Sequence, residues 1–152
     1  KALVAEQKVW ATQWEIHPDI TVILVDNTKV ALARMAAAFY GHPADKMKVI
    51  GITGTKGKTT VACMVQQVLQ QSGVKTGLIG TIQIDTGKGI YQNVNTTPDA
   101  LEIHRYLKEM EEAGCRYVVM EVSSQGLKHS RVEGIDFEIG VFTNLELQMY
   151  DF

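Results

Sequence analysis

The sequence predicts an α/β fold with a mostly parallel sheet and a nucleotide-binding loop of the P-loop type. Apolar runs rich in β-branched residues alternate along the chain with segments whose apolar residues recur at helical spacing. A strand, a glycine-rich loop and a helix follow one another over residues 49–71. Because the carboxyl ends of parallel strands meet at one edge of a sheet, ligand-binding residues are expected at that edge.

The loop belongs to the stretch Gly51-Ile-Thr-Gly-Thr-Lys-Gly-Lys-Thr-Thr60, and the predicted strand before it is Val49–Ile52. Gly54 and Gly57 let backbone N–H groups turn towards an anion, and the start of the following helix adds partial positive charge. The helix is predicted from an apolar pattern made by Val61, Met64, Val65, Val68 and Leu69. These features together predict a site for the phosphates of a nucleotide.

Two side chains of the loop carry the expected chemistry. Lys58 is expected to contact the β- and γ-phosphates, and the hydroxyl of Thr59 to bind Mg²⁺. The strict pattern G-x-x-x-x-G-K-[ST] is not met, because Ile52 stands where its first glycine would be. The alternative is a glycine turn followed by an exposed lysine, which the flanking strand and helix disfavour.

Residues 1–45 are predicted to form the end of a smaller α/β domain. Ile20–Val25 is a continuous apolar run typical of a strand, and Asp26-Asn27 offers an N-cap for a helix over Val30–Tyr40. The apolar side of this helix is expected to consist of Ala31, Leu32, Met35, Ala38 and Phe39. Gly41 and Pro43 end the helix, so residues 46–152 are predicted to form part of a second, central domain.

The rest of the chain continues the alternation. Thr76–Ile84 is predicted as one bent strand or two short ones, and Ile90–Val94 returns as a hairpin partner. Thr97 and Pro98 open a helix that Gly114 ends. Two more strands are predicted, Tyr117–Met120 and Phe137–Thr143.

Composition excludes several classes of partner. The net charge of −2 suggests neither a nucleic acid nor an anionic membrane, and no apolar run approaches the roughly 20 residues that span a bilayer. Cys63 and Cys115 lie far apart and fit neither a disulfide framework nor a zinc site. Two buried free thiols in a reducing compartment are therefore expected, which favours a cytoplasmic protein.

Further site candidates follow the strand Tyr117–Met120. Glu121 comes directly after it and is placed to be a second partner of Mg²⁺, the alternative being a cap of the next helix. Ser123 fits a site residue or a plain cap. Arg131 fits a clamp on a carboxylate or phosphate, or a surface residue, and His129 is a candidate because it lies close to Arg131.

Five segments in register resemble the Mur ligases, the ATP-dependent amino-acid ligases of peptidoglycan synthesis, and within them the MurE type. The segments are Gly51–Thr60, Asn95-Thr-Thr-Pro-Asp99, Met120-Glu-Val-Ser-Ser124, Arg131-Val-x-Gly134 and Val141-Phe-Thr-Asn-Leu145. The resemblance covers about residues 46–145. Residues 1–45 are similar in layout to the end of the family's N-terminal UDP-binding domain.

The resemblance implies a two-step reaction with ATP and Mg²⁺ as cofactors. ATP would phosphorylate the D-glutamate carboxylate of UDP-MurNAc-L-Ala-D-Glu, and the amine of a free amino acid would attack the acyl phosphate. Lys58 and Glu121 would be catalytic, and Thr59 and Glu121 would bind the metal. ATP would contact Gly54, Thr55, Lys56, Gly57, Lys58, Thr59, Thr60 and Asn144. The muramyl peptide would contact Asn95, Thr96, Thr97, Ser123, His129 and Arg131.

The sequence departs from the family after Leu145, where the family continues with an Asp-His-Leu-Asp-x-His type of segment and this chain has Glu146-Leu-Gln-Met-Tyr-Asp-Phe152. The family's carbamylated lysine and C-terminal amino-acid-binding domain have no counterpart here. We therefore expect a partial chain, or one that lacks residues between Leu145 and Glu146, that cannot ligate by itself.

Two other functions stay open at this point. One is a nucleotide-binding pseudo-ligase or partner module, and the other is a sister ligase of the cyanophycin or folylpolyglutamate synthetase type. A monomer without nucleic-acid or membrane partners is expected. The sequence leaves open whether the incoming amino acid is meso-diaminopimelate or L-lysine.

Overall fold

The computed structural model describes residues 1–8 and 17–146. The residues after Glu146, where the sequence departs from the family pattern, lie outside the described residues. A six-stranded sheet has the order β6-β5-β4-β7-β3-β8. Its strands are β3 (Lys48–Thr53), β4 (Thr76–Ile79), β5 (Gln83–Asp85), β6 (Ile90–Gln92), β7 (Tyr117–Glu121) and β8 (Phe137–Phe142). The strands β4, β7, β3 and β8 are parallel, and β5 and β6 extend the sheet as an antiparallel hairpin. The predicted fold class is confirmed, and the predicted bend resolves into the two strands β4 and β5.

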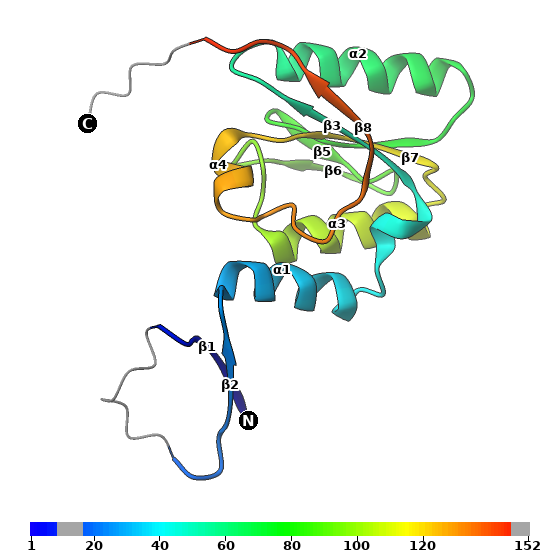
Figure 1. Ribbon diagram of the computed structural model, residues 1–152. Helices are drawn as coiled ribbons and strands as arrows, with labels where there is room; N and C mark the ends of the chain where they lie inside the picture. Colours follow the sequence, from blue (N-terminus) through cyan, green and yellow to red (C-terminus); the bar gives the residue numbers. More distant parts are fainter. Residues whose placement is uncertain (9–16, 147–152) are drawn as a thin grey trace.

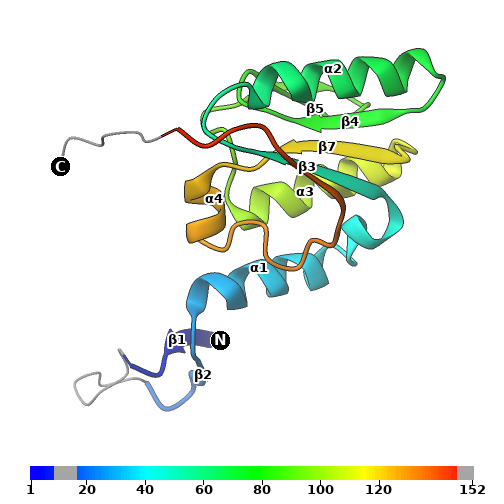
Figure 2. The ribbon, with the colours of Figure 1, turned by 45° about the horizontal axis from the view of Figure 1, so that its top comes forward.

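Helices cover both faces of this sheet (Figures 1 and 2). One face packs against α2 (Lys58–Gln71), and the other packs against α3 (Ala100–Glu112), on which α1 (Thr28–Phe39) lies in turn. The short helix α4 (Ser124–Lys128) follows β7. Within the part of the chain that the structure describes, no helix is long and apolar enough to cross a membrane.

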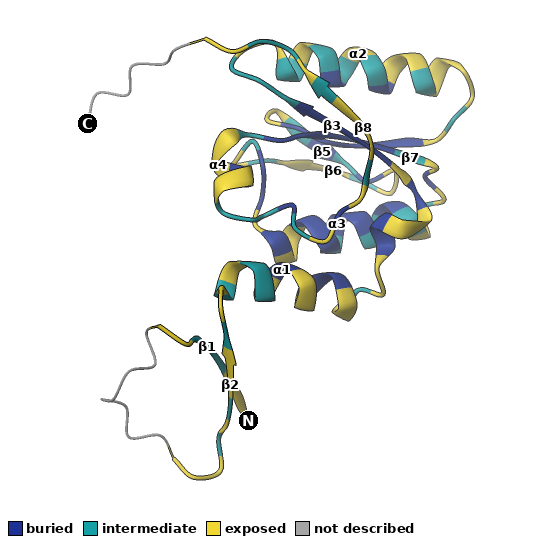
Figure 3. Ribbon diagram, viewed as in Figure 1, coloured by how far each residue is buried: buried dark blue, intermediate teal, exposed yellow. Residues whose placement is uncertain are grey.

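The buried residues form one cluster on each face of the sheet (Figure 3). The cluster under α2 includes Ile50, Ile52 and Leu78, and the cluster under α3 includes Ile79, Leu107 and Met120. The central parallel strands are buried on both faces, as expected for apolar runs without polar alternation. This two-sided core fixes the carboxyl ends of β3 and β7 side by side, where Ile52 pairs with Glu121.

The predicted face of α2 is only partly correct. Val61, Val65 and Leu69 pack against the sheet cluster, whereas Met64 and Val68 are exposed. Ala62 is the fully buried apolar residue of this helix, because its small side chain lets the helix lie close to the sheet.

The N-terminal residues form a separate parallel pair, β1 (Ala2–Glu6) and β2 (Thr21–Val25), which leads into α1. Asn27 caps α1 as predicted, since its side chain accepts hydrogen bonds from two backbone N–H groups. The short 3₁₀ helix η1 (Pro43–Lys46) joins α1 to β3 and packs against α3. The predicted boundary between residues 45 and 46 falls within η1 and stays a prediction.

The predicted apolar side of α1 is wrong. Leu32, Met35 and Phe39 are 48%, 54% and 80% exposed. The buried residues are Ala33, Ala36 and Ala37. Alanine side chains allow the close approach between α1 and α3, so this helix packs through its smallest residues and turns its largest ones outward.

Candidate nucleotide and metal site

The glycine-rich loop lies between the end of β3 at Thr53 and the start of α2 at Lys58. Gly54 and Gly57 both have positive φ angles, 133° and 81°, which side chains other than glycine rarely adopt. A Cβ atom at Gly54 would also collide with the hydroxyl of Thr143. Gly54 is therefore required by the segment directly after β8, which passes beside it, and the shifted position of this glycine in the motif has a structural reason.

The side chain of Lys58 folds over this loop. Its ammonium donates hydrogen bonds to the carbonyls of Gly54 (2.7 Å) and Thr55 (3.1 Å). The ammonium is therefore held beside the glycine-rich loop, where it could reach a phosphate bound by the loop N–H groups. The alternative of a plain exposed lysine is wrong, because Lys58 is only partly exposed and bonded to the loop.

Glu121 ends β7 and is 1% exposed. Its carboxylate accepts hydrogen bonds from Thr59 Oγ1 (2.8 Å), Thr81 Oγ1 (3.0 Å) and the backbone N–H of Thr81 (2.8 Å). Among residues 1–8 and 17–146, no basic side chain forms an ion pair with it. A buried carboxylate without a cationic partner is costly, and a bound cation would remove that cost.

The residues around Glu121 fit Mg²⁺. Thr59 supplies a hydroxyl oxygen and Glu121 a carboxylate, while the phosphates of a nucleotide would supply further oxygen ligands. Within the described residues there is no group of three or more His, Cys, Asp or Glu side chains that could hold a metal ion. The alternative in which Glu121 caps the next helix is wrong, because Ser123 caps α4.

Thr81 is a residue that sequence reasoning missed. It follows β4, the strand beside β7, so its position at the same edge of the sheet could have been predicted from the strand order. Gly80 makes the approach possible, since a Cβ there would lie 2.9 Å from Glu121 Oε1. The hydroxyl of Thr81 also lies 3.1 Å from that of Thr96.

The end of β8 holds the other side of the loop. The amide of Asn144 accepts from Lys56 N–H (3.0 Å) and donates to the Lys56 carbonyl (3.1 Å), and Thr143 Oγ1 donates to the same carbonyl (2.7 Å). The Asn144 carbonyl accepts from Thr55 N–H (3.0 Å). Asn144 therefore lies at the loop, as expected, and it shapes the loop backbone. A direct contact with ATP stays a prediction.

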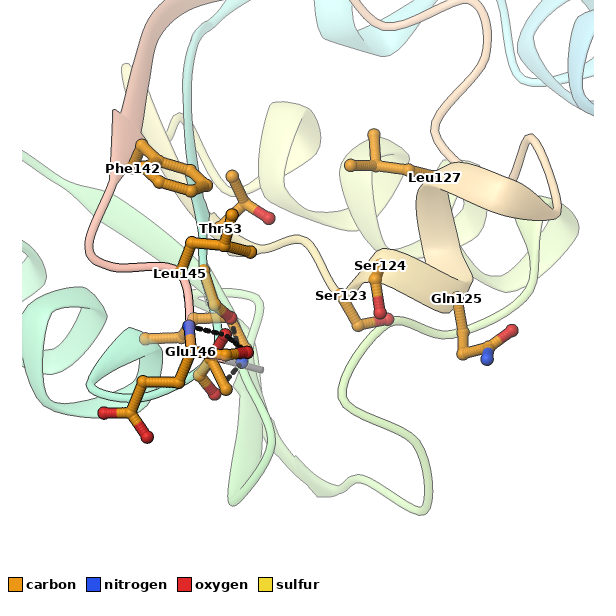
Figure 4. Close-up of a pocket in the computed structure, with 11 residues that line it drawn as sticks. Thr53, Ser123, Ser124, Gln125, Leu127, Phe142, Leu145 and Glu146 are labelled. Atoms are coloured by element: carbon orange, nitrogen blue, oxygen red, sulfur yellow. Dashed lines mark hydrogen bonds between the residues drawn. The ribbon is translucent and has the colours of Figure 1, made fainter. Parts of the chain in front are cut away.

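A cavity of about 520 Å³ opens between this loop and α4. Figure 4 shows Thr53, Phe142 and Leu145 on one side and Ser123, Ser124, Gln125 and Leu127 on the other. Lys58 and Thr55 also line it. The cavity joins the expected phosphate site to the residues that follow β7.

Two of the predicted substrate residues, Ser123 and Arg131, are hydrogen-bonded to a third, Thr97. This residue is 1% exposed, and its hydroxyl donates to the Glu121 carbonyl (3.1 Å) and accepts from Ser123 N–H (2.9 Å). Arg131 donates to the Thr97 carbonyl (2.7 Å). Thr97 thus holds Ser123 and Arg131 together from within the fold.

His129 borders a second cavity, of about 340 Å³, together with Lys29, Asp99 and Arg131. Its Nδ1 atom lies 2.8 Å from Lys29 Nζ. The positive charge of Lys29 lowers the pKa of His129, and burial and the charge of Arg131 lower it further. Because an ammonium can only donate, this contact requires an unprotonated Nδ1 atom that accepts the hydrogen bond.

The family follows from a comparison of the whole sequence. The profile of the Mur ligase middle domain matches residues 52–151, which is more than half of the chain. The chain belongs to the Mur ligase family. The predicted resemblance is thereby confirmed.

Individual relatives show which Mur ligases the chain is similar to. The chain is 46% identical over its whole length to the UDP-N-acetylmuramoyl-L-alanyl-D-glutamate–2,6-diaminopimelate ligase of Clostridium perfringens, of which it covers 30%. It is 44% identical to the ligase of the same name from Geobacillus kaustophilus, over 99% of this chain and 29% of the relative. A solved structure of a ligase with this name aligns with a TM-score of 0.71 at 25% identity, over 92% of this chain and 28% of the other. The chain thus spans about 30% of the length of these Mur ligases.

The geometry brings together most of the predicted Mur ligase site and leaves a few residues apart. The loop residues, Glu121 and Asn144 meet at the carboxyl ends of β3, β7 and β8, while Thr97, Ser123 and Arg131 are linked behind them. Asn95 is exposed, and its backbone N–H donates to the side chain of Asn93 (3.3 Å). Thr143 and Lys29 were not predicted, because their roles depend on contacts with segments distant in the sequence.

Proposed function

We propose that this chain is the nucleotide-binding part of an ATP-dependent ligase that adds 2,6-diaminopimelate to UDP-MurNAc-L-Ala-D-Glu. The single observation that carries the proposal is the arrangement in which Thr59 donates to the buried carboxylate of Glu121 while the adjacent Lys58 lines a cavity of about 520 Å³. The names of the relatives at 42–46% identity support the choice of substrates. Meso-diaminopimelate is favoured over L-lysine for that reason.

The reaction has two steps. A carboxylate oxygen of D-glutamate attacks the γ-phosphorus of ATP, the bond to the β-phosphate oxygen breaks, and ADP leaves. The amine of the amino acid then attacks the acyl carbon of the acyl phosphate, inorganic phosphate leaves, and the amine loses a proton. Both steps develop or move negative charge on phosphate oxygens, so catalysis depends on positioning and on charge neutralisation.

Each residue of the site has a task in this scheme. Lys58 would exchange its two loop carbonyls for phosphate oxygens and so neutralise charge on the transferred group. Thr59 and Glu121 would hold Mg²⁺, which supplies further neutralisation of the phosphates when bound. Ser123 and Arg131, which are both hydrogen-bonded to Thr97, would contact the muramyl peptide.

The test uses the full-length gene product that contains this sequence. We expect phosphate release from ATP that requires both UDP-MurNAc-L-Ala-D-Glu and meso-diaminopimelate, with a tripeptide product detected by mass. Product formed with L-lysine but not with meso-diaminopimelate would show that L-lysine is the amino acid added. ATP binding without any product from either amino acid would support the pseudo-ligase alternative. We also propose that the protein is a monomer and is located in the cytoplasm.

A further inference from the structure

The second cavity lies where three segments meet. Figures 1 and 2 both place the start of α1 next to the start of α3 and the loop after α4. The cavity has a volume of about 340 Å³ and is lined by Lys29, Leu32, Asp99, Ala100, His129 and Arg131. His129 and Arg131 are the residues for which the family resemblance implies contact with the muramyl peptide. Lys29 comes from α1, outside every motif of the family resemblance.

The pKa of Glu6 is lowered by hydrogen bonds from Thr28 and also by the charge of Lys29, so one carboxylate lies near this cation of the cavity without forming an ion pair with it. Within residues 1–8 and 17–146, neither Lys29 nor Arg131 forms an ion pair, although seven other lysines and arginines do. Asp99 also lines the cavity, and its Oδ1 atom accepts the Glu102 N–H as the cap of α3 (2.9 Å). Unpaired cations around a concave surface indicate an anionic ligand.

The neutral imidazole of His129 orients the lysine. Its Nδ1 atom accepts a hydrogen bond from the Lys29 ammonium at 2.8 Å, which leaves the other two N–H groups of the ammonium to donate elsewhere. Lys29 is also the second residue of α1, and Ala100 is the first residue of α3, so two helix starts add partial positive charge at the same cavity.

We propose that Lys29 is a substrate-binding residue whose ammonium contacts anionic oxygens of the UDP-muramyl dipeptide in this cavity. The inference rests on the proposed function and extends it, because it adds a residue from α1 to the site. The anionic group is either the diphosphate or a glutamate carboxylate, both of which present the same oxygen chemistry to an ammonium. Lys29 would thereby connect α1 to the substrate that the central sheet acts on.

The experiment compares Lys29→Met, Lys29→Arg and the control Lys128→Met in the full-length gene product. Lys128 is an exposed neighbour of His129 that does not line the cavity. For Lys29→Met we expect KM for UDP-MurNAc-L-Ala-D-Glu to rise about tenfold or more, as for the loss of one charge-assisted hydrogen bond, with kcat and KM for ATP unchanged. Lys29→Arg is expected to restore most of the affinity, and Lys128→Met to stay within twofold of the wild type.

Binding of UDP, UDP-MurNAc and UDP-MurNAc-L-Ala-D-Glu to the same variants identifies the anion. A loss already present with UDP supports contact with the diphosphate, and a loss that appears only with the dipeptide supports contact with the glutamate carboxylate. An unchanged KM in Lys29→Met of an active enzyme would overturn this inference alone. An equal loss for ATP and the muramyl substrate would also overturn it, since it would indicate a general role in the fold. A wild-type protein that binds none of these compounds would overturn the proposed function itself.

Discussion

Replacement of Glu121 by glutamine tests the metal site most directly. The side chain is 1% exposed and accepts three hydrogen bonds, so glutamine fits the same space while losing the charge. A pair of unit charges about 4 Å apart interacts by about 4 kcal/mol at an effective dielectric constant of about 20, and a divalent ion interacts more strongly. After the cost of removing both groups from water, we expect a net loss of about 3 kcal/mol, or roughly a hundredfold in the affinity for Mg²⁺ with ATP.

The assay is thermal unfolding followed with and without Mg²⁺ and a non-hydrolysable ATP analogue. At a ligand concentration of about 100 times its Kd, the wild type should gain about 2.7 kcal/mol of unfolding free energy, and a variant with a hundredfold weaker Kd should gain only about 0.4 kcal/mol. Without metal, Glu121→Gln should be at least as stable as the wild type, because a buried unpaired carboxylate has been removed. A variant that loses stability without metal yet keeps the full gain on ligand addition would refute the metal role and leave a structural one.

Two further predictions concern the loop and the buried core. Gly54→Ala should weaken ATP binding at least tenfold, because φ is positive there and a Cβ would collide with Thr143. The control is Gly140→Ala on β8, where a Cβ would meet open space, and calorimetry should show that this variant binds ATP as the wild type does. His104 is fully buried without a hydrogen bond to either ring nitrogen, and burial lowers its pKa. The unfolded chain therefore takes up the proton first, so the unfolding free energy should fall as the pH drops below about 6.5, by up to about 1.4 kcal/mol per pH unit. In urea titrations at pH 7.5 and 5.0, His104→Leu should lose part of this pH dependence, and an unchanged dependence would show that another group causes it.

The geometry of the candidate phosphate site could be predicted from the sequence because its signals are local. Gly54, Gly57, Lys58 and Thr59 lie within six residues of each other, and the strand and helix that flank them have clear periodicity. Glu121 could be found because a parallel strand that ends in a carboxylate delivers it to the same edge of the sheet. These inferences needed only the alternation of strands and helices.

The missed features depend on packing between distant segments. Thr81 is a site residue only because β4 lies next to β7, and the sequence does not state the order of the strands. The apolar face of α1 was predicted from side-chain size, but the helix packs through alanines against α3, which periodicity alone cannot reveal. Lys29 reaches His129 across 100 positions of the chain, so no local pattern could have connected them.

The end of β7 contacts both the proposed nucleotide site and the residues proposed to bind the muramyl peptide. The side chain of Glu121 turns towards Thr59 and the phosphate loop, while its backbone carbonyl accepts from Thr97. Thr81 adds a second link, because its hydroxyl lies between Glu121 and Thr96. Thr96 is thus linked through Thr81 to the carboxylate that is proposed to bind Mg²⁺, on the side where the muramyl peptide is proposed to lie. Such coupling would join the binding of Mg²⁺ and ATP to the alignment of the carboxylate that ATP must phosphorylate.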